Sequence, residues 1–366
     1  MSPFSRLMTG KKFYFCFFQA CFLFGFIFSN LIYSSFTTLG DGYDPITFNF
    51  QTSSFDRTQI VLLIYKILSF IFPHKVSSFF LCVLNGFLAW AIWCNIRSAS
   101  VRQIYVLCFS SIFFLAWASI PSKEQVVITF TFFSFLILQN MFSTRDSFSF
   151  LKILLYVFSV SVISYIRYPL ALYLIPLFVL ALRSRINFKN FSIFTGLIAF
   201  ALIILFCIIL NDLLFEFPIL SSLRSWVSGV KWGFFGYNAG SNREYLAGMY
   251  DELWYIPYGI FSLILPVGIM DSTEALKYFV IFLAGIPALL VCLKIVFEVF
   301  TIRKSNEFVV MLSIWIPVIL VAVVVFSPYV AFNGGASLRY VQSIYPALTI
   351  FPLILLDWAR QTRCKN

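Results

Sequence analysis

Residues 38–56 read TLGDGYDPITFNFQTSSFD and form the first polar stretch after an apolar run at residues 13–33. The stretch holds Asp41, Asp44 and Asp56, although only 11% of the chain is charged. An apolar run of about twenty residues is long enough to cross a bilayer. We therefore expect residues 38–56 to be the first loop that the chain delivers across a membrane, and its side sets the direction of every later crossing.

The composition predicts an integral membrane protein. Of the 366 residues, 61% are hydrophobic, and the mean hydropathy of +0.92 is far above that of a soluble domain. Apolar runs recur along the whole length, so we predict a single membrane-embedded domain over residues 1–366. The net charge of +11 comes from Lys and Arg between these runs. Basic cytoplasmic loops explain this pattern better than a nucleic-acid surface does.

The apolar runs predict an all-α polytopic fold of about ten transmembrane helices with one or two short interfacial or re-entrant helices. The short runs at residues 59–72 and 258–270 are interpreted as the latter, because segments of this length seldom cross. Placing the basic residues inside puts both termini in the cytoplasm and the long segment 211–258 outside. The predicted spans are residues 13–33, 76–94, 104–120, 125–142, 153–166, 170–182, 191–210, 275–297, 308–326 and 341–356.

The acidic residues fall on one side of this topology. Of the fifteen acids in the chain, only Asp146, Glu298, Glu307 and Asp357 are predicted to lie inside. Acids contribute little to membrane orientation, so their distribution is separate information. It indicates that the outer face carries the chemistry.

Several classes of site are excluded by residue content. None of the eight cysteines lies in a predicted outer loop, which argues against a disulfide framework. His74 is the single histidine, which excludes a metal site built on histidines. The chain has no P-loop, dinucleotide fingerprint, nucleophile elbow or zinc-protease motif. Carboxylates and basic residues on the predicted outer side remain as candidates, and no metal ligand set is predicted.

Asp41 and Asp44 in GDGYDP are the first candidates for a catalytic base. A carboxylate on an ordered loop can take the proton from a sugar hydroxyl that attacks an activated anomeric carbon. Gly, Asp and Pro also dominate turns for conformational reasons alone. Both interpretations stay open, although loops do carry functional residues.

The motif PSKE at residues 121–124 precedes the predicted span 125–142. Ser122 with Gln125 three residues later is a capping-box pattern, and Glu124 suits the positive end of a helix. These structural roles would account for the motif. Lys123 at the membrane boundary can also hold a phosphate, and Glu124 is a second candidate base.

Arg167 in YIRYP lies at the outer end of the predicted span 153–166, and Pro169 is predicted to start the next helix. An arginine in this position can extend its charge to the interface. It can also bind a lipid diphosphate in bidentate fashion, which lysine does less well.

Arg339 follows the tight loop at residues 333–335, where two glycines let the backbone approach a ligand closely. Arg224 and Arg243 lie in the long segment 211–258 among mixed charges and aromatic residues. That composition suits a sugar-binding surface, and it equally suits an aromatic belt at the membrane interface. These three arginines join Lys123 and Arg167 as candidate substrate-binding residues.

The acidic GDGYD loop, PSKE and the late sequence GGASLRYVQSIYP at residues 334–346 together resemble a known family. This is the family of bacterial O-antigen or capsule repeat-unit polymerases and related GT-C-type membrane glycosyltransferases. The resemblance implies a bacterial inner-membrane enzyme that acts on undecaprenyl-diphosphate-linked glycans at the periplasmic face, among membrane lipids. A chain-length regulator and a flippase are the implied protein partners. No cofactor is implied, although a divalent cation held by diphosphate and carboxylates stays open.

The resemblance also assigns roles. GT-C enzymes use a first-loop carboxylate, which corresponds to Asp41 or Asp44. Polymerases rely on outer-loop arginines, which correspond here to Arg167, Arg224, Arg243 or Arg339. We expect no large soluble C-terminal domain of the kind that some GT-C members carry. The modest size of the chain and its single long late outer segment favour a polymerase.

Three alternatives are kept. One is a GT-C-type transferase that adds a single sugar from a polyprenyl-phosphate donor. Another is a flippase for the same lipid-linked oligosaccharide, but transport paths need polar groups at membrane depth, often in broken helices. Here the charges cluster at span ends, with Lys294 and Glu298 near the inner end of span 275–297. An acyl-modifying enzyme would need a catalytic histidine, and His74 is poorly placed.

Overall fold

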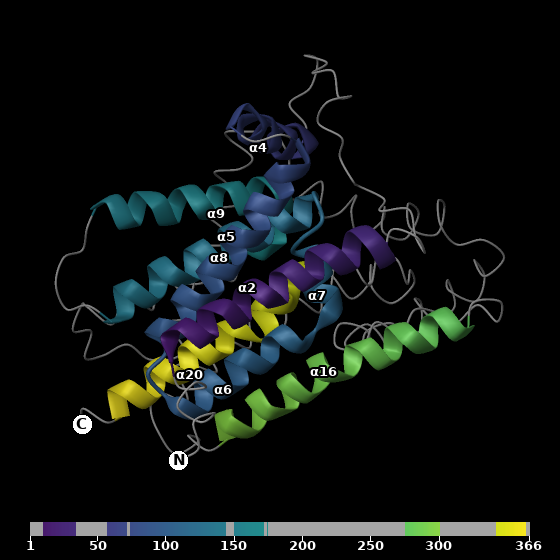
Figure 1. Ribbon diagram of the computed structural model, residues 1–366. Helices are drawn as coiled ribbons and strands as arrows, with labels where there is room; N and C mark the ends of the chain where they lie inside the picture. The colour runs from purple at the N-terminus through teal and green to yellow at the C-terminus, as the bar shows by residue number, and fades with distance from the viewer. Residues whose placement is uncertain are drawn as a thin grey trace, which may run out of the picture.

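The computed structural model describes residues 10–33, 57–71, 74–143, 150–171, 174, 275–300 and 342–363. These residues form helices and connecting turns without a strand, which confirms the all-α prediction for this part of the chain (Figure 1). The elements are α2 (Lys11–Ile27), η1 (Phe28–Tyr33), α4 (Arg57–Ile71), α5 (His74–Asn95), α6 (Ala99–Leu107), η2 (Cys108–Ser110), α7 (Ile112–Trp117), α8 (Lys123–Ser143), α9 (Phe150–Ala171), α16 (Ala275–Phe300) and α20 (Ile350–Arg363).

Three described segments are long and apolar enough to cross a membrane: Lys11–Leu31, Val76–Asn95 and Lys123–Met141. They coincide with the predicted spans 13–33, 76–94 and 125–142. The full number of ten crossings stays a prediction, because several of the other spans lie outside the described residues.

Helices α2 and α5 form an antiparallel pair. Tyr14 stacks on Trp93 with ring centroids 4.1 Å apart at one end, and Phe26 meets Phe79 at 5.5 Å near the other. The start of α2 therefore lies beside the end of α5. This is the relative direction that consecutive crossings require.

Helices α5 and α8 run in the same direction. Ser78 lies 3.2 Å from Gln125 at the start of both helices, and Asn95 donates to Asn140 at 3.4 Å near their ends. Parallel neighbours need a return segment between them, and α6, η2 and α7 supply it (Figure 1). The directions of α2, α5 and α8 agree with the predicted alternation, and a membrane crossing by the return segment stays a prediction.

The return segment is not the continuous helix predicted for residues 104–120. It is broken at Cys108–Ser110, and α7 ends at Trp117. Two consecutive serines explain the break: the Ser110 hydroxyl donates to the Leu107 carbonyl at 2.7 Å, and Ser111 Oγ accepts from the Phe114 N–H at 3.4 Å. Serine side chains offer the backbone alternative partners in this way and so end one helix and cap the next.

An aromatic cluster forms the centre of the described bundle. Phe132 of α8 lies between Phe22 of α2, Phe109 of η2 and Phe114 of α7, with ring centroids 6.2–6.3 Å apart. The pairs with Phe22 and Phe114 are edge-to-face and the pair with Phe109 is tilted. Edge-to-face pairs each contribute about 0.5–1.5 kcal/mol beyond area burial. The high phenylalanine content of the chain therefore has a packing role here.

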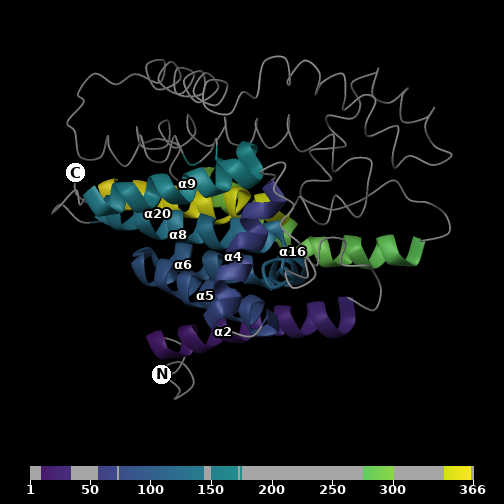
Figure 2. The ribbon, with the colours of Figure 1, turned by 90° about the horizontal axis from the view of Figure 1, so that it is seen from above.

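Helix α4 lies across the bundle. It contacts α5, α8 and α9, and it runs crosswise to α2, α8 and α20 (Figure 2). At 15 residues it is short for a crossing. This geometry agrees with the prediction that residues 59–72 form an interfacial helix.

Helix α9 is longer than predicted. Pro169 lies inside α9, which continues to Ala171, so the expected helix boundary between Arg167 and Pro169 is wrong. A proline removes one backbone hydrogen bond, and here it does so near the end of the helix, because α9 ends two residues later at Ala171.

The last described segment is helical from residue 342 to 348, turns at Thr349 and continues as α20. The Thr349 hydroxyl donates to the Tyr345 carbonyl at 2.7 Å within this turn. Both α20 and α16 contact α6, and both run beyond the predicted ends at residues 356 and 297. Their extra turns carry charged residues, which are described below.

Candidate functional site

The structure describes the side chains of two of the predicted site residues, Lys123 and Glu124, at the start of α8. The backbone of Arg167 lies in α9, which contacts α4 and α8. Lys123 and Glu124 are consecutive residues of α8, so their proximity follows from the sequence alone. The other predicted site residues lie outside the described residues, namely Asp41, Asp44, Arg224, Arg243 and Arg339.

Residues 118–122 connect α7 to α8, and we call them the α7–α8 turn. Ser122 Oγ accepts from the Gln125 N–H at 3.2 Å, so half of the predicted capping box is present. The other half of a capping box would be a bond from the Ser122 N–H to the Gln125 side chain. Here the Ser122 N–H donates to the Tyr65 hydroxyl at 3.2 Å instead. A residue of α4 thus does what the glutamine does in an isolated capping box.

The Gln125 side chain joins three helices instead. Its Oε1 accepts from the Tyr65 hydroxyl of α4, and its Nε2 donates to the Ser78 carbonyl of α5 at 3.0 Å. The Ser78 hydroxyl lies 3.2 Å from the same Oε1. Gln125 and Tyr65 are both fully buried, so these bonds are shielded from solvent and hold the turn in one position.

Two side chains of α5 donate hydrogen bonds to carbonyls of the α7–α8 turn. The Ser78 hydroxyl donates to the Ser119 carbonyl at 2.9 Å, and Asn85 Nδ2 donates to the Ala118 carbonyl at 3.2 Å. These carbonyls follow the end of α7, where helical partners are missing. The polar side chains of α5 therefore satisfy a helix end that would otherwise be unfavourable inside an apolar bundle.

Glu124 lies in the first turn of α8 and is 0% exposed. The positive end of the helix dipole stabilises a carboxylate in this position. Burial raises the pKa of the Tyr65 phenol, and the charge of Glu124 raises it further. Tyr65 is therefore a neutral hydroxyl that can donate to Gln125 while it accepts from Ser122.

Lys123 is only partly buried, whereas the next residue, Glu124, is fully buried. A lysine next to the N-terminal N–H groups of a helix is a suitable arrangement for a phosphate. The chemistry that this pair can perform is therefore binding of an anion. Proton transfer to Glu124 as a base would require its buried carboxylate to become accessible.

Sequence reasoning missed Tyr65 and Ser78. Tyr65 lies in an apolar run 60 residues before its partner Gln125, and Ser78 is an ordinary small residue near a helix start. No local signal marks either contact. The capping-box pattern around Ser122 did identify the turn, but it paired Gln125 with the wrong partner.

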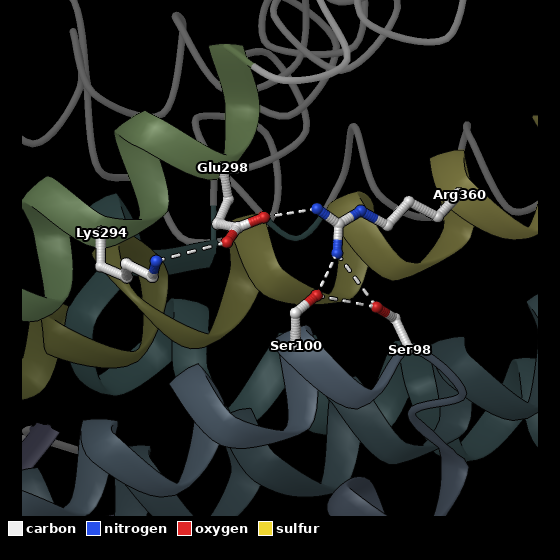
Figure 3. Close-up of polar contacts among 5 residues, drawn as sticks. All are labelled: Ser98, Ser100, Lys294, Glu298 and Arg360. Carbon is white, nitrogen blue, oxygen red and sulfur yellow. Dashed lines mark hydrogen bonds and ion pairs between the residues drawn. The ribbon is translucent and has the colours of Figure 1, made fainter.

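A second polar cluster lies where α6, α16 and α20 meet, and we call it the inner cluster (Figure 3). Glu298 lies between Lys294, at 3.5 Å, and Arg360. Arg360 also donates to the hydroxyls of Ser98, at 3.0 Å, and Ser100.

The inner cluster contains Glu298 and lies beside Asp357, two of the four acids predicted to lie inside. Asp357 accepts from the backbone N–H groups of Arg97 and Ser98. These contacts are at the end of α5, whereas Glu124 lies beside Gln125, which contacts the start of α5. The described acids are thus divided between the two ends of the bundle, and which end faces the cytoplasm stays a prediction.

No group of three or more His, Cys, Asp or Glu able to hold a metal ion occurs in the part of the chain that the structure describes. The cysteines described there are free thiols. Cys207 and Cys364 lie outside this part, so the absence of a disulfide framework stays a prediction.

Comparison with protein-family models, curated proteins and solved structures gives no match to this chain. Its function is therefore inferred from its own residues.

Proposed function

We propose that this chain is a bacterial inner-membrane glycosyltransferase that joins undecaprenyl-diphosphate-linked oligosaccharide units into a surface polysaccharide at the periplasmic face. The observation that carries the proposal is the α7–α8 turn. It is followed by the partly buried Lys123 and the buried Glu124 at the boundary of a candidate span, at the opposite end of the bundle from the inner cluster. The loops with Asp41 and Arg339 are predicted to reach the same side.

The donor diphosphate needs cations. Lys123 sits beside the N-terminal N–H groups of α8, and we assign it to the diphosphate together with Arg167 and Arg339. Charge-assisted hydrogen bonds to the diphosphate stabilise it as a leaving group. Arg224 and Arg243, in the long segment, are assigned to the glycan and its diphosphate end.

The reaction requires one base. The acceptor hydroxyl oxygen forms a bond to the anomeric carbon of the donor sugar, and the bond from that carbon to the diphosphate oxygen breaks. The lipid diphosphate leaves with the electron pair, and the base takes the hydroxyl proton. The burial of Glu124 favours Asp41 or Asp44 as this base, with Glu124 supporting Lys123 and the turn.

A deletion strain of the source organism tests the proposal. Loss of long polysaccharide chains, with single repeat units still attached to the lipid core, is the expected result on a polysaccharide gel. Loss of the single unit as well would indicate a flippase or an earlier single-sugar transferase. Normal chains in the deletion strain would refute the proposal.

Complementation with variants then tests the residues. Lys123→Ala and Arg339→Ala should shorten the chains at unchanged protein level. Lys152→Ala is the matched control, because Lys152 is also partly buried but lies at the start of α9, beyond the far end of α8. Equal chain lengths in all three strains would remove Lys123 and Arg339 from the site.

A further inference from the structure

We infer that Tyr65 is a positioning residue, through which the crosswise helix α4 sets the α7–α8 turn and with it Lys123 and Glu124. The functional part of this inference, that Tyr65 affects activity through Lys123, rests on the proposed function, because it assumes that Lys123 acts on substrate. The structural part does not depend on any activity.

The two opposite faces of helix α4 differ in solvent exposure. Val61 and Tyr65 are fully buried, whereas Leu63, Ile67 and Phe70 are 39%, 52% and 82% exposed. Residues spaced by three, four or seven share one face of a helix. One face of α4 therefore packs on the bundle while the opposite face presents apolar side chains, as in a helix that lies in a membrane interface.

Tyr65 connects the packed face of α4 to the two residues that flank Lys123 and Glu124. Its hydroxyl accepts from the Ser122 N–H at 3.2 Å and donates to Gln125 Oε1. Ser122 and Gln125 directly flank Lys123 and Glu124 in the sequence. One phenolic oxygen thus fixes the residues on both sides of the pair.

The hydrogen bonds that join Ser122 to the first turn of α8 are long, although those of residues 118–120 are of ordinary length. The Gln125 N–H reaches Ser122 Oγ at 3.2 Å, the upper end of the usual range, and the Val126 N–H reaches the Ser122 carbonyl at 3.4 Å, beyond it. Removing the Tyr65 hydroxyl would leave the buried Ser122 N–H without its acceptor, which is unfavourable. A Tyr65→Phe variant keeps the ring and its packing, so it isolates this single oxygen.

Hydrogen exchange tests the structural part on the full-length chain in lipid nanodiscs. In Tyr65→Phe, the amides of residues 119–127 should exchange roughly tenfold faster, the change that corresponds to about 1.4 kcal/mol of lost hydrogen bonding.

Tyr105→Phe is the matched control, because Tyr105 is also fully buried and donates to the Ala89 carbonyl at 3.0 Å. It should leave residues 119–127 unchanged. Equal protection of these residues in Tyr65→Phe and the wild type would overturn the inference.

Polysaccharide chain length tests the positioning role. Tyr65→Phe should shorten the chains at unchanged protein level, and it should shorten them no further when added to Lys123→Ala. Normal chains despite faster exchange would refute the positioning role. Additional shortening in the Lys123→Ala background would also refute it, because a loss that does not pass through Lys123 is a general structural effect.

The two proposals can fail separately. If the deletion strain makes normal polysaccharide, the proposed function fails, and the exchange measurement still decides whether α4 holds the turn. If exchange is unchanged in Tyr65→Phe, the inference about α4 fails while the proposed function stands on its own test.

Discussion

The carboxylate of Asp357 accepts a hydrogen bond from the backbone N–H of Ser98 at 2.8 Å, although the two residues are 259 positions apart. Ser98 is the N-cap residue of α6, yet its own side chain makes no capping bond. Asp357 also accepts from the Arg97 N–H at 3.1 Å. A residue of α20 therefore caps α6, and this contact joins the end of the described chain to its middle.

Asp357→Asn should lower the free energy of unfolding by about 1 kcal/mol, because a neutral amide is a weaker acceptor for two backbone N–H groups. Denaturant unfolding of the full chain in detergent micelles measures the change. Gln361→Ala is the control: Gln361 also donates to Asp357, at 2.5 Å, but its loss leaves both backbone bonds in place. An equal effect of the two variants would contradict the capping role.

Gly25→Ala should lower the free energy of unfolding by about 1–3 kcal/mol. A Cβ at Gly25 would lie 2.5 Å from the Leu115 carbonyl oxygen, so α2 and α7 would have to separate. Gly86→Ala is the matched control in the same bundle, because a Cβ there meets the flexible end of Gln19 at 2.9 Å. Thermal unfolding of both variants should show the difference, and a harmless Gly25→Ala would show that the two helices pack less closely.

Arg360→Ala should lower the free energy of unfolding more than Lys294→Ala does. The Arg360 variant leaves Glu298, whose side chain is only 12% exposed, without its closest cation, and we expect a loss of about 2 kcal/mol. The Lys294 side chain is 50% exposed, so its pair with Glu298 contributes less than about 0.5 kcal/mol. Unfolding measurements that rank the two variants in the opposite order would contradict this assignment.

The sequence predicts the existence of most of the described helices because their apolar runs are long. The predicted spans 13–33, 76–94 and 125–142 agree with α2 with η1, α5 and α8 within a few residues. The break at Cys108–Ser110 was missed, because hydropathy averages over serines inside an apolar run. The continuation of α9 past Pro169 was missed because the proline was taken to mark a boundary between two helices, whereas it lies inside α9, two residues before its end.

The candidate site is predictable only in part. The capping pattern at Ser122, which is a local signal, located the turn before Lys123 and Glu124, and the roles of these two residues stay predictions. Tyr65 was not, since its contact with Gln125 spans 60 positions and follows from how α4 packs across the bundle. The same reason applies to Asp357, which was expected only as a cytoplasmic acid and not as the cap of α6.

Thiol labelling in spheroplasts tests the central claim most directly, namely that the α7–α8 turn opens to the periplasmic side and the inner cluster to the cytoplasm. Lys123→Cys and Arg97→Cys variants are treated with a membrane-impermeant maleimide before and after the membrane is opened, and the wild-type chain with its eight cysteines gives the background. We predict labelling of Lys123→Cys in intact spheroplasts and of Arg97→Cys only after opening. The reverse pattern would place Lys123 in the cytoplasm and contradict the proposed function.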